Sequence, residues 1–204
     1  LPEPSDQATA DAVEGIRQEL ARARTLRSAG KYKDAMGLAK TAAERAESVD
    51  YPPVLAEAIL SRGQLAQDIG DYEQAQADLE RAVWMGTAHK HDRVTLRAAN
   101  SLLSFIGFTQ QKPEEAKIWE RHAEAMLERV GGDLPQAAQL ANGRGNLFLA
   151  QQDFEKASEY YKEVLRLREE MGNAAPSSLG GTYGNLGTAA LELGDNETGK
   201  EYFD

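Results

Sequence analysis

The stretch Gly70-Asp71-Tyr72-Glu73-Gln74-Ala75 separates two helical stretches, and its pattern occurs five times in the chain. Each time, a Gly or Gln ends a helical stretch, an aromatic residue or its substitute follows two positions later, and a small residue follows three positions after that. The other four copies begin at Gly30, Gln111, Gln152 and Gly194, so successive copies are 40, 41, 41 and 42 residues apart. A period of this length is the signature of an internal structural repeat. The sequence therefore predicts an array of five similar units.

Each unit is predicted to be two helices joined by a short turn. The first helix has a small residue seven positions before the turn in every unit, namely Ala23, Gly63, Ser104, Gly145 and Gly187. Two helix backbones approach closely only where no large side chain stands between them, so these positions indicate tight packing. In the second helix, Leu79, Tyr161 and Phe203 stand four positions after a small residue, which gives that face alternating large and small side chains.

A helix pair patterned in this way cannot bury both faces alone, whereas stacked pairs can. Gly and Pro punctuate the connections between units, and strand-like alternation is absent from the sequence. The predicted fold is all-α, a right-handed α-solenoid of five helix-turn-helix repeats with the last one truncated. Residues 1–8 are expected to be a linker and residues 9–204 a single repeat domain, with units at about 9–50, 51–90, 91–132, 133–173 and 174–204.

Composition excludes several classes of partner. The 204 residues have a net charge of −10, which disfavours nucleic acid and anionic membrane, because both require a cationic face. Without cysteine there is no disulfide framework and no thiolate metal site, and a cytoplasmic location is expected. No apolar run approaches the roughly 20 residues that span a bilayer. The chain reads as a fragment of a larger protein that ends within a helix, and weak self-association through the truncated last repeat is expected.

The small residue before the turn, the Gly-Asp-Tyr turn and the Ala pair of the second helix together resemble the tetratricopeptide repeat over about residues 10–204. Gly63–Ala82 and Gly187–Phe203 match it best. The common tetratricopeptide unit has 34 residues and HEAT-type units about 40 to 47, but the Gly-x-Tyr-x-x-Ala turn favours the former. The longer unit here is similar to the subclass found in kinesin light chain and in arrays attached to bacterial serine/threonine kinases. The third unit departs from the pattern, with Pro113 in place of an aromatic residue and Glu120 in place of a large apolar one.

Catalytic and metal-binding patterns are weak. His89 and His91 flank a lysine, and no carboxylate or cysteine stands at ligand spacing from them. The glycines between Gly180 and Gly187 lack the preceding strand and the Gly-Lys-Ser/Thr ending of a phosphate loop, and they fit helix packing better. No set of acid, base and nucleophile stands out. We therefore expect no enzyme activity, no cofactor and no metal in this fragment, although the full-length protein can carry a kinase domain elsewhere.

The resemblance implies that the first helices line a concave groove that binds a peptide. The side chains expected to face it are Arg17, Arg24, Leu60, Gln64, Ser101, Phe105, Gln139, Asn142, Asn146, Asn185 and Thr188. Asn is a mediocre helix former, so Asn142, Asn146 and Asn185 suggest amides that bind the backbone of an extended peptide. Ordinary polar solvation or local capping explains them equally well. Phe105 and the nearby Phe108 fit a core role better than ligand contact, since aromatic residues at helical spacing usually pack inside.

Six basic residues fall within the 17 residues from Arg17 to Lys33, in an otherwise acidic chain. Arg17 and Arg24 share the expected groove face. One hypothesis is that they receive an acidic side chain, a carboxy terminus or a phosphorylated residue of the partner, for which guanidinium groups are suited. The alternative is a solvated helix face that pairs with acids of the neighbouring unit.

These patterns favour a non-catalytic interaction module or scaffold that binds a protein or peptide segment. By resemblance, its context is a larger bacterial signalling protein, such as a serine/threonine kinase. The alternative is a regulatory domain in which a small molecule or short peptide changes the shape of the superhelix. An RNA-binding solenoid is disfavoured by the net charge of −10 and by the lack of a repeated pair of base-reading residues.

Overall fold

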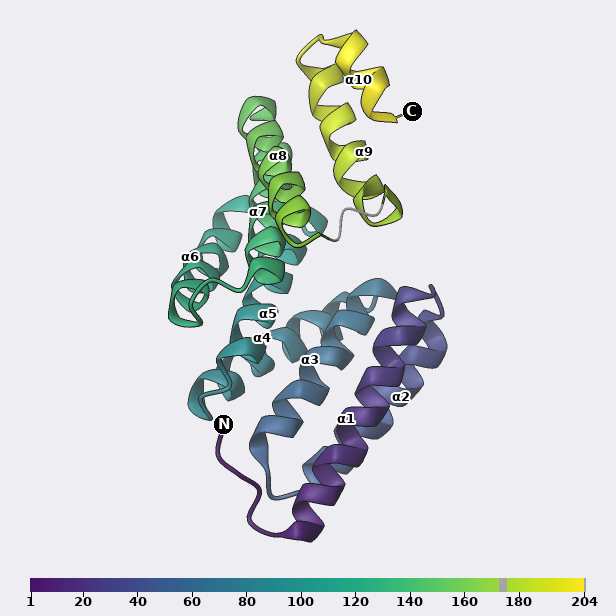
Figure 1. Ribbon diagram of the computed structural model, residues 1–204, viewed down its shortest axis with the longest axis vertical. Helices are drawn as coiled ribbons and strands as arrows, with labels where there is room; N and C mark the ends of the chain where they lie inside the picture. The colour runs from purple at the N-terminus through teal and green to yellow at the C-terminus, as the bar shows by residue number, and fades with distance from the viewer. Residues whose placement is uncertain (173–175, 204) are drawn as a thin grey trace. The chain divides into compact units, whose positions relative to one another are not determined.

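The computed structural model describes residues 1–172 and 176–203, and every regular element in those residues is helical (Figure 1). The helices pair as α1 (Gln7–Ser28) with α2 (Tyr32–Glu47), α3 (Pro52–Asp68) with α4 (Tyr72–Ala88), α5 (Asp92–Ser104) and the π-helical turn η1 (Phe105–Thr109) with α6 (Pro113–Arg129), α7 (Leu134–Ala150) with α8 (Phe154–Glu170), and α9 (Pro176–Glu192) with α10 (Asn196–Phe203). The predicted all-α class and the five helix pairs are confirmed. No helix in the described part of the chain is both long and apolar enough to cross a bilayer.

The chain divides into two compact units, Leu1–Ala99 and Asn100–Asp204, with the boundary inside α5. Within the first unit α1 packs on α2, α2 on α3, and α3 on α4. Within the second, α6 packs on α7, α7 on α8, α8 on α9, and α9 on α10 (Figure 1). Stacking of successive helices in chain order makes the fold an α-solenoid. The single domain over 9–204, with its five repeat limits, stays a prediction.

The turn motif has one backbone conformation in all five copies. The residue that ends the first helix has a positive φ each time: 73° at Gly30, 81° at Gly70, 56° at Gln111, 61° at Gln152 and 82° at Gly194. This left-handed conformation closes a helix and is easiest for glycine, which has no Cβ. The aspartate that follows caps the next helix in three of the copies, because Asp71, Asp153 and Asp195 accept hydrogen bonds from the backbone N–H groups of Gln74, Lys156 and Thr198.

The small residues of the first helices receive the large residues of the second. A Cβ atom built on Gly63 would lie 3.1 Å from the Leu79 side chain, one on Gly145 would lie 2.5 Å from the Tyr161 ring, and one on Gly187 would lie 2.6 Å from the Phe203 ring. Each pair belongs to a single helix hairpin and to equivalent positions of its repeat. The tight packing expected from sequence is confirmed, and it explains why the first helix cannot carry a larger residue there.

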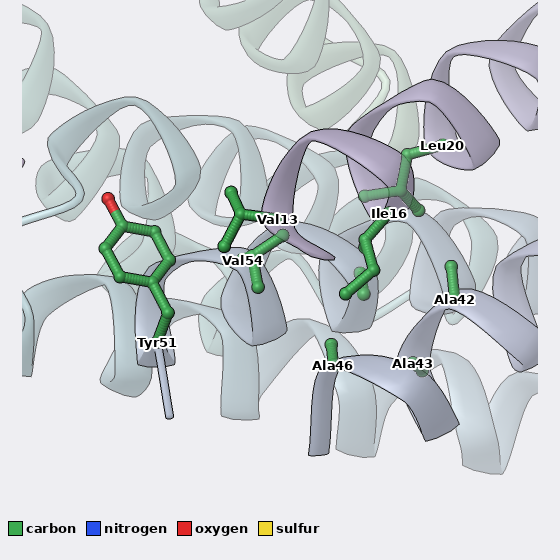
Figure 2. Close-up of a cluster of buried hydrophobic side chains, with 9 residues drawn as sticks. Val13, Ile16, Leu20, Ala42, Ala43, Ala46, Tyr51 and Val54 are labelled. Carbon is green, nitrogen blue, oxygen red and sulfur yellow. The ribbon is translucent and has the colours of Figure 1, made fainter. Parts of the chain in front are cut away.

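Alanine supplies much of the contact surface between α1 and α2. Val13, Ile16 and Leu20 of α1 form one buried cluster with Ala42, Ala43 and Ala46 of α2 and with Tyr51, Val54 and Ala58 (Figure 2). Short side chains on α2 let the longer chains of α1 approach its backbone. The Tyr51 hydroxyl donates a hydrogen bond to the carbonyl of Pro2 at 2.9 Å, which holds the chain start against this cluster.

The third helix pair is irregular, as its sequence suggests. The first helix ends in η1, where the N–H of Gln110 bonds to the carbonyl of Phe105 five residues earlier. Phe105 is fully buried, whereas Phe108 is 40% exposed, so the expected core role is correct for Phe105 alone. Glu120, which replaces a large apolar residue, accepts a hydrogen bond from Arg144 at 2.8 Å and thereby joins α6 to α7 through charge.

A buried ion pair holds the second hairpin. Arg62 of α3 donates two hydrogen bonds to the carboxylate of Asp78 of α4, at 2.7 and 2.8 Å. Asp78 is only 2% exposed, so water does not solvate its carboxylate. The Arg62 guanidinium stabilises that negative charge instead.

Candidate functional site

The first unit presents a basic face, made by the side chains of α1 that meet α3 and by the first turns of α5. Arg17 donates to the Glu57 carboxylate from Nε, at 3.1 and 3.2 Å, and from Nη2, at 2.8 Å. Arg27 pairs with Asp68, with Nη2 to Oδ1 at 3.1 Å. Each pair joins two residues 40 or 41 positions apart, which are one repeat apart in the array. Arg17 and Arg27 therefore pair with acidic residues of the neighbouring repeat, which is the alternative that the sequence left open for the basic residues of α1.

Glu57 connects three repeats, because its carboxylate also contacts His91 Nε2 at 3.1 Å. Burial by itself would raise the pKa of the Glu57 carboxyl, but the hydrogen bonds from His91 and Arg17 outweigh it and hold the pKa below its ordinary value. Glu57 is therefore ionised at neutral pH, and its carboxylate accepts the hydrogen bonds that the Arg17 guanidinium could otherwise donate to a partner.

Two further arginines give this face its positive excess. Arg24 is exposed and makes no hydrogen bond or ion pair with any residue that the structure describes. Burial lowers the pKa of the Arg97 guanidinium, and the charges of Arg24 and Arg27 lower it further. Such mutual repulsion shows that the three cations are close enough to interact. Arg24 is therefore the guanidinium in this group that can meet an acidic partner.

The second unit presents an amide face, made by Asn142 and Asn146 of α7 and Asn185 of α9. Asn146 Oδ1 accepts hydrogen bonds from the Tyr161 hydroxyl at 2.8 Å and from Asn185 Nδ2 at 3.4 Å. Asn142, one helical turn before Asn146, is half-buried and makes no hydrogen bond with the described residues. A direct hydrogen bond therefore joins Asn146 and Asn185, which lie on the first helices of successive repeats.

Tyr161 fixes the orientation of the Asn146 amide. Burial raises the pKa of the Tyr161 phenol, so it stays protonated and acts as a hydrogen-bond donor over the whole physiological range. The amide oxygen of Asn146 is thereby held toward Tyr161. The Nδ2 group of Asn146 is a hydrogen-bond donor and the Oδ1 atom of Asn185 is an acceptor. Neither has a partner among the described residues.

Two predicted groove residues are core residues. Leu60 is 1% exposed and Phe105 is fully buried, so neither side chain has a surface to offer a ligand. Stacking of the helix pairs takes up large apolar side chains that lie next to the groove positions, which is the reason for this correction. Gln64 is also buried, and its Oε1 atom lies 3.5 Å from Nη1 of Arg27.

The other predicted residues lie at the surface of the first helices. Gln139 and Thr188 are exposed and Ser101 is half-buried, and the Thr188 hydroxyl donates to the Gly184 carbonyl at 3.0 Å. The sequence prediction missed Asn100, which is 3% exposed and donates from Nδ2 to the Gln136 carbonyl at 3.2 Å. Its position, 42 residues before Asn142, was the signal that could have found it.

In the described residues, no three His, Cys, Asp or Glu side chains gather in a way that could hold a metal ion. His91 is engaged with Glu57, and burial lowers the pKa of the His122 imidazole. What the two faces offer is charge and hydrogen-bonding capacity for another chain.

Comparison with known proteins agrees with the repeat. Two family profiles, both described as tetratricopeptide repeat, match residues 56–83 and 95–170, which together make about half of the chain. The mouse (Mus musculus) Tonsoku-like protein is 26% identical over 175 residues, which are 86% of this chain but only 12% of that protein.

Solved structures share the fold. The crystal structure of BtubC (BKLC) from P. vanneervenii has a TM-score of 0.67 at 18% identity and covers 97% of this chain and 89% of its own. A putative kinesin light chain from Podospora anserina, with nearly identical TPR-like repeats, has a TM-score of 0.62 at 16% identity and covers 93% of this chain and 92% of its own. The two family profiles, with the period, the turns and the glycine packing described above, show that the chain belongs to the tetratricopeptide repeat family.

Proposed function

We propose that the chain is a non-catalytic protein-interaction module whose amide face binds an extended segment of a partner protein. The observation that carries this proposal is the arrangement of Asn146 and Asn185, which keep one donor and one acceptor available on adjacent repeats. An extended backbone presents N–H and C=O groups in alternation, and a side-chain amide can satisfy both kinds. The partner is therefore recognised through its backbone, with little demand on its side chains at these points.

The basic face of the first unit adds a preference for acid. Arg24 is exposed and makes no hydrogen bond or ion pair with the described residues, and Arg97 adds to its positive charge, whereas Arg27 is neutralised by Asp68. A carboxylate or a carboxy terminus of a bound protein would form charge-assisted hydrogen bonds here. Arg17, which the sequence placed in this role, is occupied by Glu57 and contributes less.

The module belongs, in this proposal, to a larger cytoplasmic signalling protein of bacterial type, such as one with a serine/threonine kinase domain. The resemblance to kinase-associated arrays supports that context, and the small share of the Tonsoku-like protein that the chain covers is compatible with a module of a longer protein. The polar character of both faces favours an interaction module over the alternative, a regulatory domain in which a small molecule or short peptide changes the shape of the superhelix, because small-molecule sites are mostly apolar.

The test begins with selection of peptides from a random 12-residue display library on the folded protein. Affinity of the best peptide is then compared between wild type and the variants Asn142→Ala and Asn185→Ala, with Lys162→Ala on α8 as the matched surface control. We expect each asparagine variant to weaken binding by about five-fold, since one net hydrogen bond contributes about 1 kcal/mol. Equal affinity of all four proteins would contradict the proposal.

A further inference from the structure

A cavity of about 530 Å³ lies in the first unit, at the turn between α1 and α2. Residues 30–34 form one side of it, and Asp68 and Ile69 at the end of α3 form the other. Its volume lies within the range of ligand-binding clefts in proteins. We call it the rim cavity, because it lies at the turn end of the helices, beyond the basic face.

The charges in the rim cavity favour an anion. Lys31 and Lys33 are exposed and make no hydrogen bond or ion pair with the residues that the structure describes. Asp68 is already neutralised by Arg27, which leaves Asp34 as the opposing carboxylate. When Arg27 is counted with the lining residues, three cations stand against the two carboxylates Asp34 and Asp68, in a chain whose net charge is −10.

The rim cavity also has an apolar wall. Tyr32 is 42% exposed and Ile69 is 44% exposed, and both line the cavity. A small inorganic anion would use the lysines alone and leave this wall in contact with water. An occupant with an acidic side chain beside an aromatic or aliphatic one would satisfy the charges and cover the apolar surface together.

We propose that the rim cavity binds an acidic segment of a protein, in which carboxylate side chains stand next to an apolar side chain. This site lies in the first unit, is separate from the amide face, and does not depend on the function proposed for that face. Lys31, just before α2, and Lys33, in its first turn, are suited to such a segment, since an ammonium group acts as a point charge that binds carboxylates in several geometries.

The repeat itself supplies a variant that removes the charge without harming the turn. Lys31 occupies the position that aspartate occupies in three other units, where Asp71, Asp153 and Asp195 accept a backbone N–H at 3.3, 3.2 and 3.1 Å. Lys31 makes no such cap on α2. Lys31→Asp therefore installs the cap of the other repeats, and the melting temperature should stay the same or rise. Lys33→Gln completes the variant, and Lys40→Gln on the exposed surface of α2 is the matched control.

The experiment is an NMR titration of the 204-residue protein with capped tetrapeptides. The probes are Glu-Glu-Phe-Glu, its neutral counterpart Gln-Gln-Phe-Gln, the apolar-deficient Glu-Glu-Ser-Glu, and inorganic phosphate. We expect Glu-Glu-Phe-Glu to shift the backbone amide resonances of residues 30–34 and of Ile69 and to bind more tightly than the other three. In the double variant its affinity should fall at least about ten-fold, because two charged hydrogen bonds are lost and Lys31→Asp adds a carboxylate that repels the peptide, while Lys40→Gln should have no effect.

Several results would overturn the proposal. Equal binding of the neutral peptide would mean that the cavity recognises apolar surface alone, and equal binding of phosphate would mean a site for free anions. Undiminished affinity in a folded double variant, or shifts confined to other residues, would place the acidic segment elsewhere. Peptides selected on the amide face should keep their affinity for the double variant, so failure of one proposal is distinguishable from failure of the other.

Discussion

Gly145→Ala should destabilise the protein, although alanine is the better helix former. The added Cβ would lie 2.5 Å from Cε1, 2.8 Å from Cδ1 and 3.0 Å from Cζ of Tyr161. Tyr161 is fully buried and its hydroxyl is bonded to Asn146, so the ring cannot move aside freely. Inserting a methyl group into a filled core typically costs about 1–3 kcal/mol of unfolding free energy.

The matched control is Gly181→Ala in α9 of the same unit. A Cβ on Gly181 meets no atom of the described chain within 4 Å, and the residue is exposed. Both variants gain the same helix propensity, about 1 kcal/mol, so the difference between them isolates the packing contribution. We expect Gly181→Ala to stabilise the protein and Gly145→Ala to be about 1–3 kcal/mol less stable than that variant.

The assay is urea unfolding in a Trp84→Phe background, followed by far-ultraviolet circular dichroism and by the fluorescence of Trp119, the remaining tryptophan, which is buried in the second unit. The two signals show whether that unit unfolds in one step, as the free-energy comparison requires. If Gly145→Ala proved as stable as Gly181→Ala, the explanation of the small residue seven positions before each turn would be refuted.

Three further predictions concern the turns, the buried charge and the response to acid. Gln152→Gly should raise the unfolding free energy by about 0.5–1 kcal/mol, because Gln152 has a φ of 61°, and a lower midpoint in urea would contradict that origin of the turn motif. Asp78→Ala should lower the unfolding free energy by about 1–3 kcal/mol, since it leaves the half-buried Arg62 without its partner, and Arg62→Met in the same chain should recover part of the loss; no effect of Asp78→Ala alone would show that the pair is solvated. Because the folded pKa of Glu57 lies below the ordinary value of 4.5, the stability it contributes is complete above about pH 4.5 and is lost as the pH falls through the depressed pKa. Glu57→Gln should therefore flatten the fall in melting temperature over that acidic range, and an unchanged pH profile would count against the Arg17–Glu57–His91 contacts.

The repeat architecture was predictable because its signals are local and recur. Five turns have one conformation, and only a residue that tolerates positive φ can end the helix, so Gly and Gln mark the same place in each unit. The glycine at 145 and the tyrosine at 161 likewise reflect a steric requirement that recurs at Gly63 and Gly187 in two other hairpins. These requirements act within one unit and leave their pattern in the sequence.

The faces were less predictable, because side-chain pairing between repeats depends on helix rotation. A rotation of a fraction of a turn decides whether Leu60 faces a ligand or the core, and the sequence pattern does not fix it. Glu57 and Asp68 were not recognised as the partners of Arg17 and Arg27, since their contacts span 40 or more residues. Tyr161 was identified as a packing residue, and its second role in orienting Asn146 depends on one hydroxyl at 2.8 Å.

Recognition of a partner's backbone by the amide face is the central claim, and it can be measured with a backbone change alone. In the best selected peptide, each amide N–H is replaced in turn by an ester oxygen, and affinity is measured for wild type, Asn185→Ala and Tyr161→Phe. We predict that one ester weakens binding to wild type by about five-fold but leaves binding to Asn185→Ala unchanged, because the lost donor and the lost acceptor form a single hydrogen bond. Tyr161→Phe, which releases the Asn146 amide, should weaken binding of the unmodified peptide. Full tolerance of the ester at every position would contradict the account.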